Sequence, residues 1–149
     1  MTIVYTIGHS NRSLAEFLNL LKEYGIEVLI DVRRFPISRK YPHFNRDALS
    51  KVLENNEIKY VWLGKLLGGY RSGGYLRHME TREYEEGIRT IIDLARKYRV
   101  AIMCSEKLWF KCHRRFISTT LVERGFRVVH IIEHGKTYEH KDRRLYGAN

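Results

Sequence analysis

The chain has 149 residues, of which 44% are hydrophobic and 30% charged, and it carries a net charge of +10 at pH 7. This length and composition are typical of one globular domain with a sizeable hydrophobic core, and they exclude an intrinsically disordered protein. No apolar run reaches the roughly 18–20 residues that a transmembrane helix needs, and the first residues lack the pattern of a secretion signal. We therefore expect a cytoplasmic protein with no membrane partner.

The first third of the chain predicts a strand, a helix and a second strand. Residues 3–7 form an apolar strand. Ser13 then starts a helix, because a glutamate follows it at the spacing of a capping box. Residues 28–30 are a wholly apolar second strand, as in a sheet covered on both faces. The stretch 36–44 contains both prolines of the chain and should be an irregular loop.

The same alternation continues through the middle of the chain. Residues 45–56 predict a helix and residues 60–63 a third strand. Residues 66–75 contain four glycines and form either a phosphate-cradling or lid loop or a flexible surface loop. Apolar residues at helical spacing predict a longer helix over 81–98.

The last third completes the pattern. A fourth strand, residues 100–103, precedes a helix that begins after Cys112 and ends at Gly125, and residues 128–132 form a fifth strand. The tail from residue 135 to 149 is basic, and we expect part of it to be mobile. Residues 1–149 thus predict a single α/β domain, a three-layer sandwich of flavodoxin- or rhodanese-like kind. Its sheet is mostly parallel and five-stranded with helices on both faces, but the strand order is left open.

Polar side chains follow the first four strands. In a parallel sheet the loops after these strands open on one edge, where open α/β sheets bind their ligands. The loops hold His9, Ser10, Asp31, Arg33, Gly64, Cys104 and Glu106, with residues 112–115 beside them. We therefore expect one positively charged pocket at this edge.

The two cysteines are the strongest candidates for chemistry. Cys112 stands near a helix start, where the helix dipole and the neighbouring arginines 114 and 115 favour a thiolate, so it is a candidate nucleophile. The alternative is a small buried residue at a helix cap. Cys104 ends a buried strand and is either reactive or an inert core thiol, and a disulfide between the two is open for a hyperthermophile. A phosphatase loop is excluded because its arginine position is Phe110.

The carboxylates and the first histidine have two interpretations each. Glu106 and Asp31 are either an acid and a base across a cleft or ion-pair partners of Arg33 and Arg114. His9 either moves protons or donates to a phosphate, or it makes a capping hydrogen bond. A zinc site is disfavoured, since the cysteines are eight residues apart and no Cys-x-x-Cys is present.

Arginines and aromatic residues in the loops predict an anionic ligand. Forked donors to an oxyanion would come from arginines 33, 39, 71, 114 and 115. Nucleobases could stack on Tyr41, Phe44, Tyr70, Tyr75 and Trp109. Local packing of long loops explains the aromatic set equally well.

Five short motifs occur in order along the chain. They are Thr6-Ile-Gly-His-Ser10, Asp31-Val-Arg33 with Pro36 and Ser38, Leu67-Gly-Gly69, Met103-Cys-Ser-Glu106 and Cys112-His-Arg114. Together they resemble the domain-of-unknown-function family 488 over roughly residues 3 to 132. The resemblance implies a single α/β domain whose motif residues form a shared pocket. It implies no particular reaction.

The sequence thus favours a small enzyme or ligand-binding domain with a Cys/His/Glu/Arg pocket for an anionic, phosphate-bearing substrate. The candidate catalytic residues are Cys112, Glu106, His9, Asp31 and Cys104. The candidate binding residues are Ser10, Arg33, Ser38, Gly68, Gly69, His113 and Arg114. No metal or cofactor is assigned, and the oligomeric state is left open. The alternatives are a nucleic-acid-binding or nucleic-acid-processing protein, which the net charge supports, and a non-catalytic interaction module.

Overall fold

The computed structural model describes residues 2–141 and contains one six-stranded sheet with the order β3-β2-β4-β1-β5-β6. The strands are β1 (Ile3–Gly8), β2 (Val28–Asp31), β3 (Lys59–Trp62), β4 (Val100–Cys104), β5 (Arg127–Glu133) and β6 (Lys136–Glu139). Strands β1 to β5 pair in parallel, and β6 pairs with β5 in antiparallel fashion. The predicted α/β class and mostly parallel sheet are therefore confirmed.

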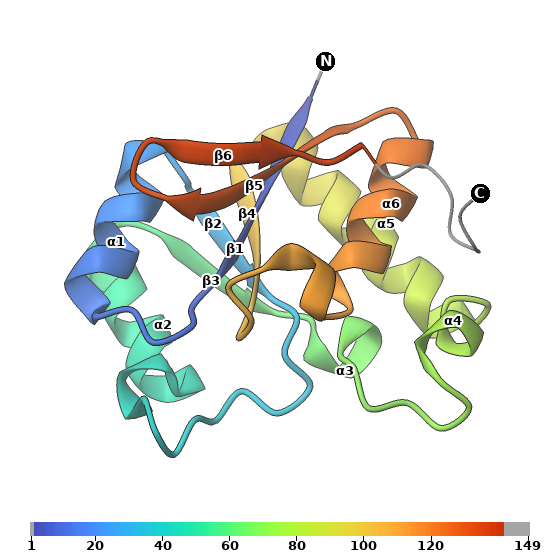
Figure 1. Ribbon diagram of the computed structural model, residues 1–149, viewed down its shortest axis with the longest axis horizontal. Coiled ribbons are helices and arrows are strands. Elements are labelled where there is room, and N and C mark those ends of the chain that lie inside the picture. The colour runs from blue at the N-terminus through green and yellow to red at the C-terminus, as the bar shows by residue number, and fades with distance from the viewer. Residues whose placement is uncertain (1, 142–149) are drawn as a thin grey trace.

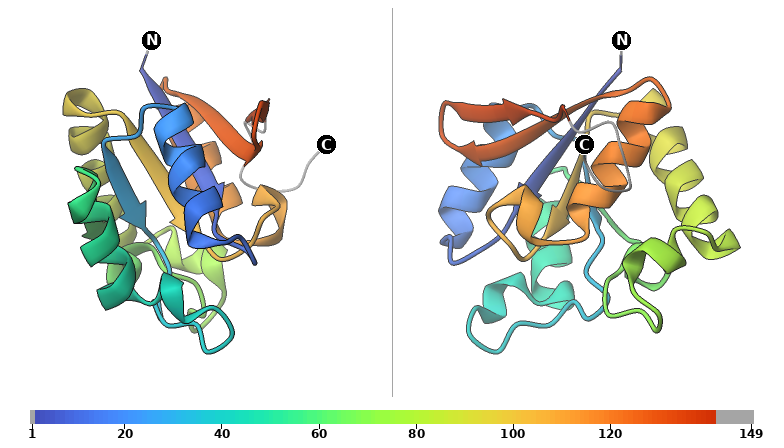
Figure 2. Two further views of the ribbon diagram at one scale, coloured as in Figure 1. Left: turned by 90° about the vertical axis from the view of Figure 1, so that its left-hand side faces the viewer. Right: turned by 45° about the vertical axis from the view of Figure 1, so that its right-hand side comes forward.

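Helices cover both faces of the sheet. One face carries α1 (Leu14–Glu23) and α2 (Arg46–Asn55), and the other carries α5 (Arg82–Lys97) and α6 (Arg114–Glu123), as Figures 1 and 2 show. The shorter helical segments are η1 (Pro42–Phe44), α3 (Gly64–Leu67), α4 (Tyr75–His78) and η2 (Trp109–Lys111). No helix in the described part of the chain is long and apolar enough to cross a membrane.

The local sequence explains where two of the helices begin. At the start of α1, Ser13 Oγ accepts a hydrogen bond from the Glu16 amide at 3.1 Å, and Glu16 Oε1 accepts one from the Ser13 amide at 3.2 Å. This is the capping box that the spacing predicts. Thr81 caps α5 in a similar way, because its hydroxyl accepts a hydrogen bond from the Tyr84 amide.

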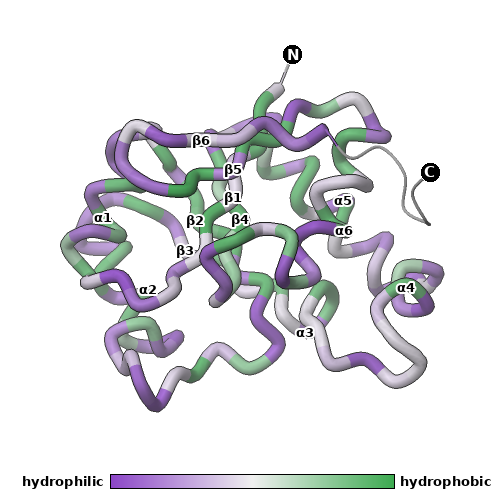
Figure 3. Tube along the Cα trace, viewed as in Figure 1, coloured by the Kyte–Doolittle hydropathy of each residue, from purple (hydrophilic) through white to green (hydrophobic). Residues whose placement is uncertain are grey.

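The sheet separates two hydrophobic clusters, one under each pair of helices. Every residue of β2 and of β4 is buried, which explains why residues 28–30 and 100–103 are all apolar. In β1, Val4 packs toward α5 and α6, whereas Ile7 packs toward α1 and α2. Figure 3 shows the hydrophobic strands at the centre and hydrophilic residues in the outer loops. The core therefore holds the strands rigidly, and their carboxyl ends reach one edge.

One prediction about the sheet is wrong: it has six strands, not five. The sixth, β6, lies in the segment from residue 135 that was expected to be partly mobile, and all four of its residues are exposed. Because β6 is an exposed edge strand without a buried face, it lacks the apolar pattern that marks the other strands. The end of the tail, 142–149, lies outside the described residues.

Candidate functional site

The ends of strands β1, β2, β3 and β4 lie side by side at the carboxyl edge of the sheet. Gly8 stands opposite Cys104, and Asp31 stands opposite both Met103 and Trp62. Backbone pairing continues into the loops, since the amide of His9 donates to the Cys104 carbonyl at 2.9 Å. The loops that carry the motifs are thus attached directly to the ends of the strands.

Two motif glycines allow loops to approach the strand ends closely. A Cβ atom at Gly8 would overlap the backbone carbonyl of Glu106, and a Cβ atom at Gly64 would overlap that of Arg33. Any other residue at these positions would displace the loops that bear these two side chains. The glycines therefore shape the site, although they bind nothing themselves.

The edge is hollowed into a cleft with two adjoining lobes of about 700 and 620 Å³. Both lobes are lined by His9, Ser38, Ser105, Glu106 and Lys111. The first lobe extends over Ser10, Lys40 and Lys136, and the second reaches Cys104, Cys112, His113, Phe35 and Tyr70. These volumes are in the range of small-molecule sites.

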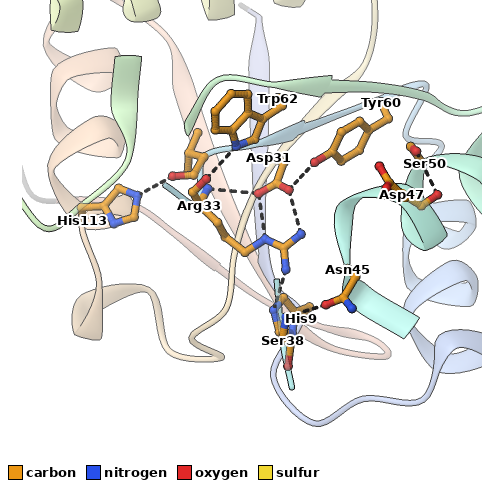
Figure 4. Close-up of polar contacts among 11 residues, drawn as sticks. His9, Asp31, Arg33, Ser38, Asn45, Asp47, Ser50, Tyr60, Trp62 and His113 are labelled. Atoms are coloured by element: carbon orange, nitrogen blue, oxygen red, sulfur yellow. Dashed lines mark hydrogen bonds and ion pairs between the residues drawn. The ribbon is translucent and has the colours of Figure 1, made fainter. Parts of the chain in front are cut away.

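Asp31 is a buried anchor and not a free acid or base. Its side chain is fully buried (0% exposed), and its carboxylate accepts hydrogen bonds from Arg33 Nε at 2.9 Å and Nη2 at 2.8 Å (Figure 4). The Tyr60 hydroxyl donates a third bond to it at 2.5 Å. Burial and the charge of Asp31 raise the pKa of Tyr60, which keeps this phenol protonated as a donor. Asp31 is therefore an ion-pair partner of Arg33, the second of its two interpretations.

His9 uses both ring nitrogens inside the protein. Its Nδ1 lies 2.9 Å from the Ser10 carbonyl, which can only accept, so Nδ1 carries the proton. Its Nε2 therefore accepts from Arg33 Nη1 at 3.3 Å (Figure 4). Burial, chiefly, and the charge of Arg33 lower the pKa of His9 to about 4. Of the two interpretations of His9, the structure shows the hydrogen bond to its loop, made by a neutral imidazole that also positions the Arg33 side chain.

His113 lines the second lobe and has one imidazole nitrogen without a hydrogen-bond partner in the described chain. Its Nε2 donates to the Val32 carbonyl at 3.0 Å, so Nδ1 keeps its lone pair. No residue of the described chain hydrogen-bonds to Nδ1, and a Cβ atom on Gly69 would lie 3.3 Å from it. Burial lowers the pKa of His113 to about 4. This side chain, predicted to bind substrate, can accept a hydrogen bond from a ligand.

The two cysteines are free thiols in contact with each other. Their sulfur atoms lie 2.7 Å apart, and Cys112 Sγ also accepts a hydrogen bond from the Arg114 amide at the start of α6, at 3.3 Å. Burial disfavours both thiolates. The shared hydrogen bond and the charge of Arg114 lower the pKa for loss of the first proton, whereas the second proton is held more tightly. Cys112 is the less buried of the two and lines the cleft.

Arg114 carries a buried charge beside this pair. Its side chain is fully buried (0% exposed) and donates to the carbonyls of Glu106 at 2.9 Å and Lys107 at 3.1 Å. Among residues 2–141, its Nε has no hydrogen-bond partner and no carboxylate forms an ion pair with it. The expected ion pair with the Glu106 side chain is absent there, because the contact is made by the Glu106 main chain. A buried guanidinium is stabilised by a nearby anion, and the adjacent cysteine pair can supply one when it loses a proton.

A buried chain of hydrogen bonds leads away from Arg114. Its Nη1 donates to Thr6 Oγ1 at 3.2 Å, and Thr6 contacts His130 Nδ1 at 2.5 Å. His130 Nε2 meets His140 Nδ1 at 2.8 Å, and His140 Nε2 meets Thr119 Oγ1 at 2.9 Å. Since the Thr119 hydroxyl donates to a backbone carbonyl of α6, every donor along the chain points away from Arg114 when both rings are neutral. The guanidinium is therefore held by the Thr6 hydroxyl at one nitrogen and by the Glu106 and Lys107 carbonyls at the other.

Sequence reasoning missed this chain of hydrogen bonds, although a signal was present. His130 is the one polar residue in the apolar run 128–132, and a buried polar side chain in a strand needs a partner. Burial, first, and the charge of Arg114 lower the pKa of His130, so its ring stays neutral. The ring is covered by Trp109, whose centroid is 4.8 Å away in a stacked arrangement.

The remaining candidates are placed as follows. Ser38 lines both lobes, Ser10 lines the first and Gly69 the second, whereas Gly68 is buried against Arg34. Arg114 lies behind the thiols and does not line the cleft. Of the aromatic residues predicted to stack bases (Tyr41, Phe44, Tyr70, Tyr75 and Trp109), Tyr70 is the exposed one. Within residues 2–141, no three His, Cys, Asp or Glu side chains are grouped so as to hold a metal ion.

Comparison with known proteins supports the family resemblance. A family described as "Domain of unknown function DUF488" matches residues 13–121, which is more than half of the chain. No significant match was found among curated proteins or among solved structures.

Proposed function

The chain belongs to the domain-of-unknown-function family DUF488, and we propose that it is a thiol-dependent enzyme that acts on an anionic, phosphate-bearing ligand. The observation that carries the proposal is the buried Arg114, which has no carboxylate partner among the described residues. Its amide donates to Cys112 Sγ, and its guanidinium and Cys104 Sγ both contact the Glu106 carbonyl. A fixed positive charge of this kind favours a thiolate, which an enzyme that uses a cysteine nucleophile exploits and an inert core thiol does not require.

The charge of the cleft supports an anionic ligand. Six of its lining residues are cationic, and two carry carboxylates. The cations are Arg33, Arg34, Lys40, Lys107, Lys111 and Lys136, and the carboxylates are Glu106 and Glu133. Lys111 lines both lobes and stands one residue before Cys112. A phosphate held by these side chains would bring the rest of the ligand over the thiols.

The chemistry follows from the position of Cys112. The thiolate electron pair forms a bond from Sγ to the electrophilic atom of the ligand, and the bond to the leaving group breaks. The leaving group departs with that electron pair and takes a proton from solvent water. A water molecule then attacks the same atom and gives up a proton to solvent, the sulfur leaves as thiolate, and the ligand is released as the hydrolysed product. His113 Nδ1 can accept a hydrogen bond from the ligand or this water.

The test is protection of Cys112 from alkylation by iodoacetamide, measured by mass spectrometry with inorganic phosphate and ribose 5-phosphate as probes. We expect millimolar ribose 5-phosphate to slow alkylation severalfold. The variant Lys40→Met, Lys111→Met should lose this protection. Lys97→Met, at the end of α5 away from the cleft, should retain it. If neither probe protects Cys112 in the wild type, the proposal is wrong.

A further inference from the structure

Three large apolar side chains lie exposed at the mouth of the lobe that contains the thiols. Phe35 is 64% exposed, Ile37 71% and Tyr70 87%. All three line this lobe, and the rings of Phe35 and Tyr70 lie 6.1 Å apart. The residues belong to the loops after β2 and after α3, at the same end of the molecule (Figure 1). Exposed apolar side chains gathered at a polar cleft mark a binding surface.

The two loops are held together in this arrangement. Arg34 Nη1 donates to the Tyr70 carbonyl at 2.8 Å, and its guanidinium lies 5.7 Å from the centre of the Phe35 ring. Gly68 packs closely on the Arg34 backbone. The position of Tyr70 thus depends on contacts with the loop that carries Phe35.

Tyr70 is also held in an unfavourable backbone conformation. Its φ is 59°, in the left-handed region that costs a residue with a Cβ atom about 1–2 kcal/mol. The ring gains no burial in return, because it is exposed to solvent. Neither the positive φ nor the exposed ring stabilises the ligand-free protein. Backbone strain of this kind is typical of ligand-binding positions.

We propose that Phe35 and Tyr70 form a stacking clip for a nucleobase whose phosphate occupies the cleft described above. This inference rests on the proposed function and names its substrate class: a nucleobase-bearing phosphate, either a free nucleotide or a single-stranded nucleic acid. Aromatic side chains stack on any base, and the cations of the cleft provide the charge that the phosphate requires. Arg34 and Lys111 line the same lobe as the two rings.

A nucleobase fits the size of this surface better than a protein partner does. A stable protein–protein interface uses about 20–30 residues on each side. The exposed apolar patch here has three side chains and is surrounded by cationic groups. The lobe volume of about 620 Å³ is suited to a nucleotide-sized ligand.

The experiment is isothermal titration calorimetry of the wild type with four probes: ribose 5-phosphate, AMP, adenosine and a single-stranded oligoadenylate. We expect AMP to bind about tenfold or more tightly than ribose 5-phosphate, since a stacked base contributes that much. Tyr70→Ala and Phe35→Ala should remove this advantage but leave ribose 5-phosphate binding unchanged. Tyr70→Phe should keep it. Tyr98→Ala, an exposed aromatic at the end of α5, is the matched control and should behave as the wild type.

The outcomes separate the two proposals. Equal binding of AMP and ribose 5-phosphate overturns the clip and leaves the proposed function intact. Failure of every phosphate probe to bind overturns both. AMP binding as tight as oligoadenylate identifies a free nucleotide, and tighter oligoadenylate binding identifies a nucleic acid. Either of these two results supports the clip, provided that Tyr70→Ala abolishes the preference.

Discussion

Removal of the Arg114 charge should raise the pH at which the cysteine pair becomes reactive. The guanidinium is fully buried, and its charge favours the anionic form of both thiols. Arg114 Nη2 and Cys104 Sγ both contact the Glu106 carbonyl oxygen, at 2.9 and 3.7 Å, so the charge lies close to the sulfur. An opposite charge within about 4–6 Å shifts a pKa by roughly 1–3 units. Replacement by methionine, which keeps the bulk of the side chain, should therefore raise the first pKa of the pair by at least about one unit. The thiolate fraction at neutral pH would fall about tenfold for each unit.

The assay is the rate of iodoacetamide alkylation of Cys112 as a function of pH. Arg114→Met should shift the midpoint of this profile upward. Arg96→Met is the matched control, because it makes the same change in net charge at an exposed position in the last turn of α5, and its profile should match the wild type. An unchanged midpoint in folded Arg114→Met would refute the reasoning.

Stability must be measured in parallel, since Arg114 also donates hydrogen bonds to two carbonyls and to Thr6. Leaving buried acceptors unsatisfied costs on the order of 1–3 kcal/mol each, so Arg114→Met should unfold at a lower temperature than the wild type. Arg114→Lys keeps the positive charge but cannot make all the hydrogen bonds of the guanidinium group. It should therefore be destabilised with a smaller shift of the alkylation midpoint, which separates the effect of charge from that of packing.

Three further predictions concern the residues around the cleft. The pKa of His9 is about 4 in the folded protein and about 6.5 in the unfolded chain, so the unfolded chain takes up the proton first as the pH falls. Stability should therefore decrease between about pH 6.5 and pH 4, by up to about 3 kcal/mol from this group, and urea denaturation of His9→Gln should show a shallower decrease. Gly8→Ala should lower the melting temperature and the Cys112 alkylation rate, because its methyl group would overlap the Glu106 carbonyl. Gly69→Ala, whose methyl group would have the His113 ring at 3.3 Å as its nearest neighbour, should change both less, and equal effects would contradict the close-approach argument. Tyr70→Gly should raise the free energy of unfolding by up to about 1 kcal/mol while abolishing any preference for AMP, because glycine adopts positive φ without strain. A loss of stability in Tyr70→Gly would show that the ring contributes to folding.

Local sequence patterns determined most of the secondary structure. Residues 28–30 and 100–103 lie in buried strands, as predicted, because an uninterrupted apolar run suits a sheet covered on both faces. Helix α1 begins at the predicted capping box, which depends on residues three apart. The alternation of strands and helices predicted a parallel sheet. A parallel sheet in turn places the motifs that follow its strands at one edge. Strand β6 escaped prediction because an exposed edge strand has no apolar face to mark it.

The tertiary structure alone decided what each side chain at the site contacts. The sequence could not say that Asp31 and His9 are both engaged by Arg33, or that Arg114 meets two carbonyls instead of the Glu106 carboxylate. Nor could it show that the exposed stacking surface is Phe35 with Tyr70. These contacts depend on through-space geometry, as between Thr6 and His130, which are 124 residues apart in the chain. Periodicity and capping report on neighbours within a few residues, whereas a hydrogen-bond partner is selected by how the whole chain packs.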